Sequence, residues 1–248
     1  MSPEVDVVAS IALVFLGAAA LAGHRLVGRP QFPRVTQQGG TVMLGRDPMN
    51  TGYWLLQPAI TALAKAGVPP AALSWLSVVP ALLGAIGASW GHWGLVAWLL
   101  LASALLDVLD GAVARVTGRS SAAGAILDST LDRYAEFALL AGISFFYRGN
   151  ESIQLIVLAA LLGSFLVTYS TAKAEALGLT PPRGFMKRSD RLALLVSAAV
   201  VTPILNHFLA PGQSRHAWPM LAATAGIAIF ANVSAITRMA ALARPHGA

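Results

Sequence analysis

Seven runs of apolar residues dominate this chain, and each is about long enough to cross the ~30 Å hydrocarbon core of a bilayer as a helix. The runs lie near residues 6–23, 71–89, 93–113, 123–146, 152–172, 191–210 and 218–237. Only 11% of the residues are charged and the mean hydropathy is +0.67, whereas about 25% of a soluble domain is charged. The sequence therefore predicts an all-α, polytopic integral membrane protein.

The N-terminal third divides into an anchor, a loop and an interfacial helix. Glu4 and Asp6 precede the first apolar run, so we expect an anchor helix rather than a cleaved signal peptide with a basic start. Residues 24–52 are polar and contain scattered Gly and Pro, which is typical of a loop. Residues 53–66 are amphipathic enough to lie along the membrane surface. We therefore divide the chain into an anchor with its cytoplasmic loop, 1–52, and a membrane domain, 53–248.

The placement of Lys and Arg predicts the orientation. If the N-terminus is outside and seven helices follow, the outer side keeps only Arg148 and Arg215 of the 17 basic residues. This asymmetry is a strong positive-inside signal. The formal charge of +6 then describes a cytoplasmic face suited to anionic headgroups or phosphates, and no motif supports a nucleic-acid partner. The absence of cysteine excludes disulfides and thiolate chemistry.

Four aspartates interrupt the apolar pattern in the third and fourth runs: Asp107, Asp110, Asp128 and Asp132. An Asp at the centre of a spanning helix costs about 2.5–3.5 kcal/mol, so four unexplained ones would cost roughly 10 kcal/mol or more. At about 100° per residue, each pair falls on one face of its helix. The short connection at 116–122, with a candidate N-cap at Ser120 or Ser121, makes the two helices antiparallel neighbours. We therefore expect the acidic faces to converge near the cytoplasmic surface.

Converging carboxylates would repel one another without a cation, whereas divalent ions would make them ligands. An all-oxygen donor set suits Mg²⁺ or Mn²⁺ better than Zn²⁺, and Arg115 on the same face is placed to meet a phosphate. Two metals beside an arginine fit displacement at phosphorus. A transporter or a non-catalytic scaffold with an acidic cation site is the alternative from another class. A transporter predicts acids spread over several helices, and a prenyl-transferring enzyme predicts two acidic motifs far apart.

The pattern Asp107-x2-Asp110-Gly111-x2-Ala114-Arg115-x8-Gly124-x3-Asp128-x3-Asp132 resembles the signature of the CDP-alcohol phosphotransferase (CDP-alcohol phosphatidyltransferase) family at every fixed position. Residues 67–74 and 232–238 are also similar to the start and end of the family's core. The resemblance covers about 60–245. It implies six core transmembrane helices, with 6–23 as an extra N-terminal helix, and a homodimer.

The same resemblance implies a reaction. Two divalent ions, Mg²⁺ or Mn²⁺, would be held by Asp107, Asp110 and Asp128, with Asp132 as a further ligand or the general base. A CDP-linked lipid such as CDP-diacylglycerol would transfer its substituted phosphate to an alcohol, which releases CMP and builds a phospholipid. The residues expected to contact the CDP-lipid are Asp107, Gly111, Ala114, Arg115, Ser121 and Gly124.

The acceptor is indicated by a second basic region. Residues 168–178 and 184–192 resemble the corresponding region of prokaryotic phosphatidylinositol-phosphate synthases, which implies a prokaryotic cytoplasmic membrane and inositol phosphate as the acceptor. The acceptor phosphate would then contact Lys173, Arg188, Arg191 and Arg238. Thr171 stands where that group commonly has Lys, and Lys173 stands where it has Arg. Arg and Lys are not interchangeable at a bidentate phosphate site. Glycerol 3-phosphate, serine or another polar alcohol therefore remains an alternative acceptor.

Overall fold

The computed structural model describes residues 2–38, 45–180, 184–209 and 217–243. Arg215, counted above on the outer side, lies outside these residues. Within them the chain forms nine α-helices and no β-strand. The helices are α1 (Pro3–Leu26), α2 (Pro33–Gln38), α3 (Asp47–Lys65), α4 (Pro70–Trp90), α5 (Trp93–Val116), α6 (Ala122–Phe146), α7 (Glu151–Ala176), α8 (Arg188–Leu209) and α9 (Trp218–Leu242).

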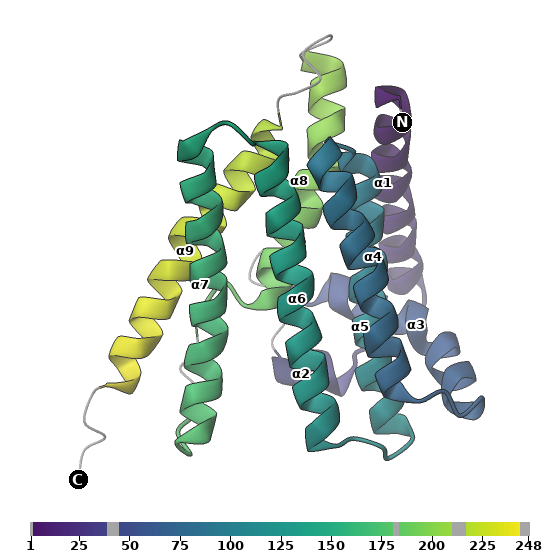
Figure 1. The fold of residues 1–248 in the computed structure, drawn as a ribbon. Coiled ribbons are helices and arrows are strands. Elements are labelled where there is room, and N and C mark those ends of the chain that lie inside the picture. Colours follow the sequence, from purple (N-terminus) through teal and green to yellow (C-terminus); the bar gives the residue numbers. More distant parts are fainter. Residues whose placement is uncertain (1, 39–44, 181–183, 210–216, 244–248) are drawn as a thin grey trace.

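The seven predicted apolar runs all become long helices, and the predicted amphipathic segment becomes α3. In the described residues, α1, α4, α5, α7, α8 and α9 are apolar enough to span a membrane by length and composition. Every 18-residue stretch of α6 contains Asp132, Arg133 and Glu136, so α6 carries too much charge for that criterion. Helix α6 nevertheless runs beside α4 through the middle of the bundle (Figure 1). The protein is therefore a multi-pass helical membrane protein with six core helices and an additional α1.

The polar segment 24–52 is less irregular than its composition suggests. It contains α2 and the first turns of α3, which begins at Asp47 followed by Pro48. A proline in the first turn does not remove a helical hydrogen bond, so it starts a helix as readily as it breaks one. The prediction of a loop over 24–52 was therefore wrong at Pro33–Gln38 and again from Asp47 onward, where the described residues are helical.

Helix α4 packs against α5 and α6, α7 packs against α9, and α8 lies between these two groups, in contact with α5 and α9 (Figure 1). The larger cluster of buried apolar residues joins α5, α6, α7, α8 and α9 and includes Ala88 of α4. Gly142 of α6 lies directly against α4, because a Cβ at this position would come 2.2 Å from the carbonyl oxygen of Ala85. Small residues allow close helix crossings in membranes, where packing rather than water exclusion drives association.

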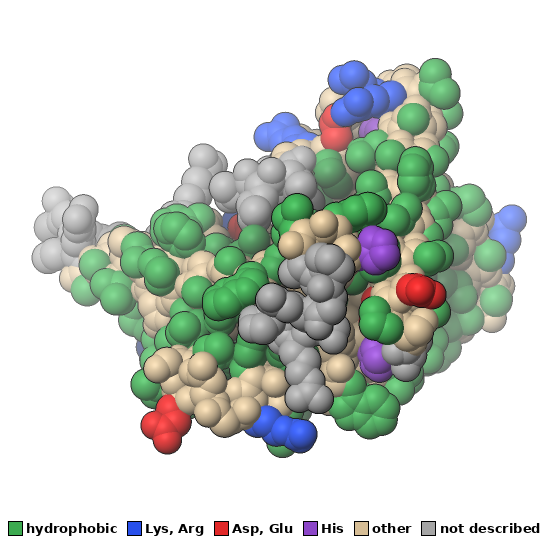
Figure 2. Space-filling view, turned by 90° about the horizontal axis from the view of Figure 1, so that it is seen from above, with side chains coloured by type: hydrophobic (Ala, Val, Ile, Leu, Met, Phe, Trp, Pro, Cys, Tyr) green, Lys and Arg blue, Asp and Glu red, His purple; other side chains and the backbone are tan. Residues whose placement is uncertain are grey.

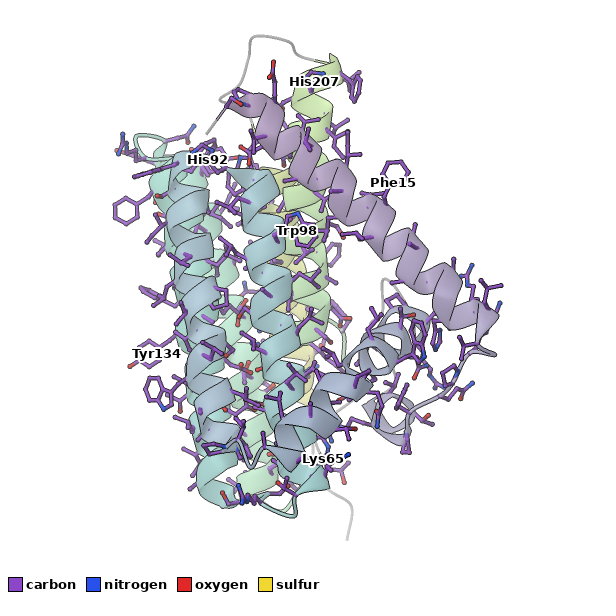
Figure 3. All side chains as sticks on the ribbon, turned by 90° about the vertical axis from the view of Figure 1, so that its right-hand side faces the viewer. Phe15, Lys65, His92, Trp98, Tyr134 and His207 are labelled. Atoms are coloured by element: carbon purple, nitrogen blue, oxygen red, sulfur yellow. The ribbon has the colours of Figure 1, made fainter. Side chains whose placement is uncertain are left out.

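The additional helix α1 leans across α5 and α8 and is fixed to α5 by polar contacts (Figure 3). Asp6 accepts a hydrogen bond from the backbone N–H of Leu95 at 3.3 Å and pairs with His92 at 3.2 Å. The indole N–H of Trp98 donates to the carbonyl of Ala9 at 2.9 Å. Phe15 is exposed on the far face of α1. One face of α1 thus docks on the core and the other is left for lipid.

The two ends of the bundle differ in chemistry. The end at which α1 begins is largely hydrophobic, and its charged side chains lie mainly at the margins of the surface (Figure 2). The signature aspartates lie at the other end, near the C-terminus of α5 and the N-terminus of α6. The N-terminus of α8 and the C-terminus of α9 reach the same end, so it gathers the acidic and basic side chains singled out in the sequence.

Candidate active site

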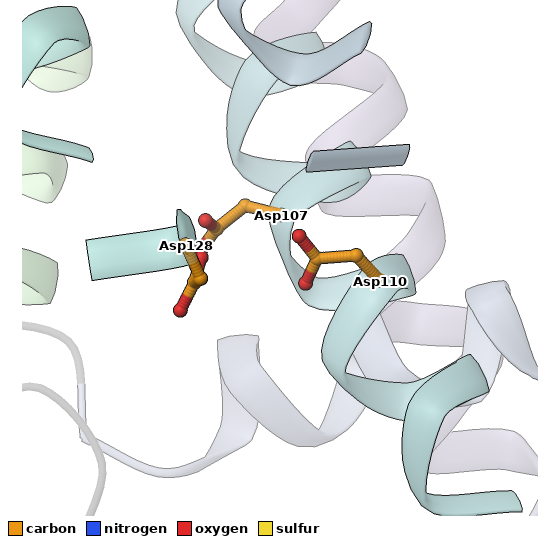
Figure 4. Close-up of side chains that lie close together, drawn as sticks. All are labelled: Asp107, Asp110 and Asp128. Atoms are coloured by element: carbon orange, nitrogen blue, oxygen red, sulfur yellow. The ribbon is translucent and has the colours of Figure 1, made fainter. Parts of the chain in front are cut away.

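Three aspartates form the centre of the site. Asp107 and Asp110 come from α5 and Asp128 comes from α6, and the three carboxylates face one another (Figure 4). One oxygen of each lies within 4.8 Å of the others. Asp110 is buried, whereas Asp107 and Asp128 are partly exposed. The predicted convergence of the two acidic faces is therefore confirmed for these three residues.

Ser74 of α4 supports the innermost aspartate. Its hydroxyl donates a hydrogen bond of 2.5 Å to Oδ2 of Asp110, and both side chains are buried. A hydrogen bond to a charged group contributes about 1.5–3 kcal/mol. Ser74 therefore fixes one carboxylate and leaves its other oxygen for a ligand. The sequence offered a signal for this partner, because Ser74 is a hydroxyl in the first turns of an apolar helix.

Arg188, the first residue of α8, connects the two acidic helices. Its guanidinium lies 2.9 Å from Oδ2 of Asp107 and 2.7 Å from Oδ1 of Asp132. The three side chains are 20–33% exposed, so water reaches this contact from one side. Asp132 is thereby brought to the edge of the aspartate cluster. Arg188 was expected at the acceptor phosphate, and the structure places it directly beside the reaction centre.

Arg191 lies one turn further along α8 and is almost completely buried. Its Nε and Nη2 donate to the two carboxylate oxygens of Glu136 at 2.6 and 2.8 Å, and Nη1 donates to the carbonyl of Met186 at 2.7 Å. Such a two-pronged pair fixes the guanidinium plane. Glu136 was not singled out in the sequence, although it lies four residues after Asp132, on the same face of an otherwise apolar helix.

Arg238 and Lys173, the other two basic residues expected at the acceptor phosphate, differ in their surroundings. Nη1 of Arg238 donates to the hydroxyl of Thr171 at 3.0 Å, while its buried Nε has no hydrogen-bond partner among the described residues. Gly184 lies against Arg238, since a Cβ there would come 2.4 Å from Nε. Lys173 is exposed, and no contact ties it to these arginines within the described part of the chain. The structure therefore gathers Arg188, Arg191 and Arg238 and leaves Lys173 at the rim.

The residues expected to meet a nucleotide form an accessible face below the aspartates. Arg115 is exposed, lies over Gly111 and reaches the hydroxyl of Tyr53 on α3 at 3.4 Å. Ser121 caps α6 by accepting a hydrogen bond of 3.1 Å from the N–H of Gly124, which confirms the predicted N-cap. Ala114, on the same face, is half-buried. These small and basic groups leave the approach to the carboxylates open.

The donor set of the cluster fits a divalent metal ion. All three groups supply carboxylate oxygens, and at these spacings one ion could contact a ligand atom from each. Mg²⁺ and Mn²⁺ prefer such oxygen donors and keep coordination positions for water or phosphate oxygens. The partial exposure of Asp107 and Asp128 leaves room for those additional ligands.

Comparison with known proteins identifies the family. A sequence model described as CDP-alcohol phosphatidyltransferase matches residues 59–236, which include the whole aspartate cluster, Arg188 and Arg191. The chain belongs to the CDP-alcohol phosphatidyltransferase family. The protein is therefore a membrane transferase that moves a substituted phosphate group from a CDP-linked lipid to an alcohol. This membership decides against a transporter or a non-catalytic scaffold.

Several relatives of this phosphatidyltransferase are phosphatidylinositol phosphate synthases. A phosphatidylinositol phosphate synthase of Mycobacteroides abscessus is 30% identical over 201 residues, which cover 78% of this chain and 86% of the relative. The crystal structure of the Mycobacterium tuberculosis phosphatidylinositol phosphate synthase with CDP-DAG bound superposes with a TM-score of 0.66 at 25% identity, covering 76% of this chain and 94% of that one. Its complex with manganese and citrate gives 0.65 at 24% identity, with coverages of 76% and 90%.

Proposed function

We propose that this phosphatidyltransferase joins CDP-diacylglycerol to inositol phosphate and releases CMP. The position of Arg188 carries the proposal, because a guanidinium within 2.9 Å of two signature aspartates favours an acceptor that is itself anionic. The relatives named as phosphatidylinositol phosphate synthases support the same acceptor. Glycerol 3-phosphate carries a phosphate too and is the second candidate, whereas serine offers no phosphate to the arginines.

The metal site is proposed at Asp107, Asp110 and Asp128, with Asp132 at its edge. The carboxylate spacing and the manganese complex of the structural relative support Mg²⁺ or Mn²⁺, and we propose two ions. When bound, they would neutralise charge on the attacking and leaving oxygens. The CDP-lipid would lie against Asp107, Gly111, Ala114, Arg115, Ser121 and Gly124.

The chain's own groups would then carry the transfer. Asp132 would accept the proton of the acceptor hydroxyl. The hydroxyl oxygen bonds to the β-phosphorus while the bond from that phosphorus to the bridging oxygen breaks, and CMP leaves with the electron pair. Arg188 and Arg238 would hold the acceptor phosphate, Arg191 would fix the floor of the site beside them, and Lys173 would attract the anion from the rim.

The proposed topology has this site at the cytoplasmic face of a prokaryotic membrane and the N-terminus outside. The distribution of Lys and Arg supports this orientation. Because the chain has no cysteine, single cysteines at Arg119 and Arg148 can test it. An impermeant thiol reagent should label R148C and spare R119C in intact cells, and the reverse labelling would invert the topology. We also propose a homodimer, which requires a mass of about twice 25.8 kDa after correction for detergent.

The acceptor is tested with purified protein, CDP-diacylglycerol and Mg²⁺, by measuring CMP with inositol phosphate, glycerol 3-phosphate, inositol or serine. We expect CMP and a phosphorylated lipid product with inositol phosphate, and little with unphosphorylated inositol. A higher rate with serine or free inositol would refute an anionic acceptor. A higher rate with glycerol 3-phosphate would keep the arginine site and replace the acceptor.

A further inference from the structure

We infer that Arg188 is a positioning residue that competes with the divalent metal for Asp107 and Asp132, and that metal binding turns its guanidinium toward the acceptor phosphate. This inference rests on the proposed function, because it concerns the same aspartates and the same acceptor site. It adds an order to the reaction, in which the site for the acceptor is completed only after the metal is bound.

Two ion pairs connect α6 to α8, one above the other. Asp132 and Glu136 are four residues apart on α6, while Arg188 and Arg191 are three residues apart on α8, so each pair of side chains shares one helix face. Arg188 contacts Asp132 at 2.7 Å and Arg191 contacts Glu136 at 2.6 Å. The two arginines therefore face α6 in the same way, but Arg188 pairs with Asp132 and Arg191 pairs with Glu136.

The two pairs differ in how firmly they are held. The Arg191 side chain is 2% exposed and has three hydrogen bonds, one of them to the backbone carbonyl of Met186. The Arg188 side chain is 33% exposed and, within the described residues, contacts only the carboxylates of Asp107 and Asp132. Arg191 is thus fixed by the protein itself, whereas Arg188 is held only by acids that belong to the proposed metal site.

Competition follows from the shared carboxylate. Asp107 is one of the three aspartates whose oxygens lie within 4.8 Å of one another, and its Oδ2 accepts from Arg188. A divalent ion at that triad would be the largest local charge, and it would repel a guanidinium bound to one of its own ligands. The partly exposed side chain of Arg188 can leave by a change of rotamer. The acceptor phosphate then provides the anion that the carboxylates no longer supply.

Metal affinity tests the competition without any turnover. Binding of Mn²⁺ to purified protein is measured from the electron paramagnetic resonance signal of the free ion. We expect Arg188→Ala and Arg188→Gln to bind Mn²⁺ about 5–150-fold more tightly than the wild type, the usual range for coupling between two sites. Arg188→Lys keeps the competing charge and should stay near the wild-type affinity. Arg148→Ala removes an exposed arginine at the other end of the bundle and should change nothing.

Weaker or unchanged Mn²⁺ binding in both Arg188→Ala and Arg188→Gln would overturn the inference, because it would show that Arg188 does not compete with the ion for the carboxylates. Asp128→Asn separates this failure from failure of the proposed function. If Asp128→Asn binds Mn²⁺ as the wild type does, the proposed metal site is wrong. If it loses Mn²⁺ while the Arg188 variants show no tightening, only the competition is wrong.

Acceptor binding provides the second test. Binding of inositol phosphate is measured by calorimetry in nanodiscs, with Mn²⁺ or with EDTA and without CDP-lipid. Because coupling is reciprocal, Mn²⁺ should strengthen inositol phosphate binding in the wild type, and this dependence should be lost in Arg188→Gln. If the wild type binds inositol phosphate equally well with and without Mn²⁺, Arg188 does not leave the aspartates for the acceptor phosphate when the metal binds.

Discussion

The buried pair of Arg191 and Glu136 should stabilise the fold rather than contribute directly to turnover. The Arg191 side chain is 2% exposed and that of Glu136 is 13% exposed, and two hydrogen bonds of 2.6 and 2.8 Å join them. Removing one partner of a buried pair leaves the other charge uncompensated, at a cost of about 3–5 kcal/mol. We therefore expect Glu136→Gln to lower stability substantially although its volume hardly changes.

The magnitude can be measured against a surface pair in the same chain. Arg25 and Asp47 lie 3.8 Å apart with side chains 56% and 46% exposed, and such pairs contribute about 0–1 kcal/mol. Thermal unfolding in one detergent should show a loss of roughly 6–20 °C for Glu136→Gln, if about 1 kcal/mol corresponds to 2–4 °C in a chain of this size. Asp47→Asn should change the midpoint by about 4 °C or less.

A double-mutant cycle then isolates the pair. Arg191→Leu with Glu136→Leu removes both charges, so its loss should be smaller than the sum of the single losses by about 1–3 kcal/mol. If Glu136→Gln is no more damaging than Asp47→Asn, or if the two single losses simply add, the buried pair does not hold α6 and α8 together. Arg191 would then be available for the acceptor phosphate in the same way as Arg188.

Three further substitutions test separate parts of the structure. Ser74→Ala removes the 2.5 Å hydrogen bond to Asp110, so Mn²⁺ binding should weaken about 10–100-fold, as for other groups that orient metal ligands; unchanged binding would exclude that role. Asp6→Asn weakens the docking of α1 on α5, so the melting midpoint should fall while CMP release from properly folded protein is retained; loss of activity at full stability would refute a purely structural α1. Gly142→Ala would place a Cβ 2.2 Å from the carbonyl oxygen of Ala85, so we expect a loss of about 1–3 kcal/mol, and a neutral effect would mean that α4 and α6 separate easily.

The spanning helices and the aspartate cluster could be predicted from the sequence because both depend on local periodicity. The run at 93–113 became Trp93–Val116, and the phase of Asp107 and Asp110 on that helix fixed which face is acidic. Because the connection to α6 is short, α6 runs antiparallel to α5 and Asp128 faces the two aspartates of α5. Helical phase and loop length were sufficient for this part of the site.

The partners of the arginines could not be predicted in this way. Arg188 meets Asp107 across 81 positions of sequence, and Arg191 meets Glu136 across 55. Which acid an arginine meets depends on how α8 crosses α6, and composition says nothing about that crossing. The segment 24–52 was mistaken for a loop for a related reason, because proline both begins and ends helices and only the tertiary packing of α3 shows which.

The role of the aspartate cluster is decided by Mg²⁺-dependent CMP release from CDP-diacylglycerol and inositol phosphate by Asp128→Asn, with Asp47→Asn as the matched control. Both substitutions replace one carboxylate oxygen by an amide NH2 group and remove a negative charge, but only Asp128 belongs to the cluster. We predict that Asp128→Asn loses CMP release by more than about 100-fold, beyond the usual loss for groups that merely orient a metal ligand, while Asp47→Asn keeps it. CMP release by folded Asp128→Asn at the rate of Asp47→Asn would show that the phosphoryl transfer takes place without this cluster.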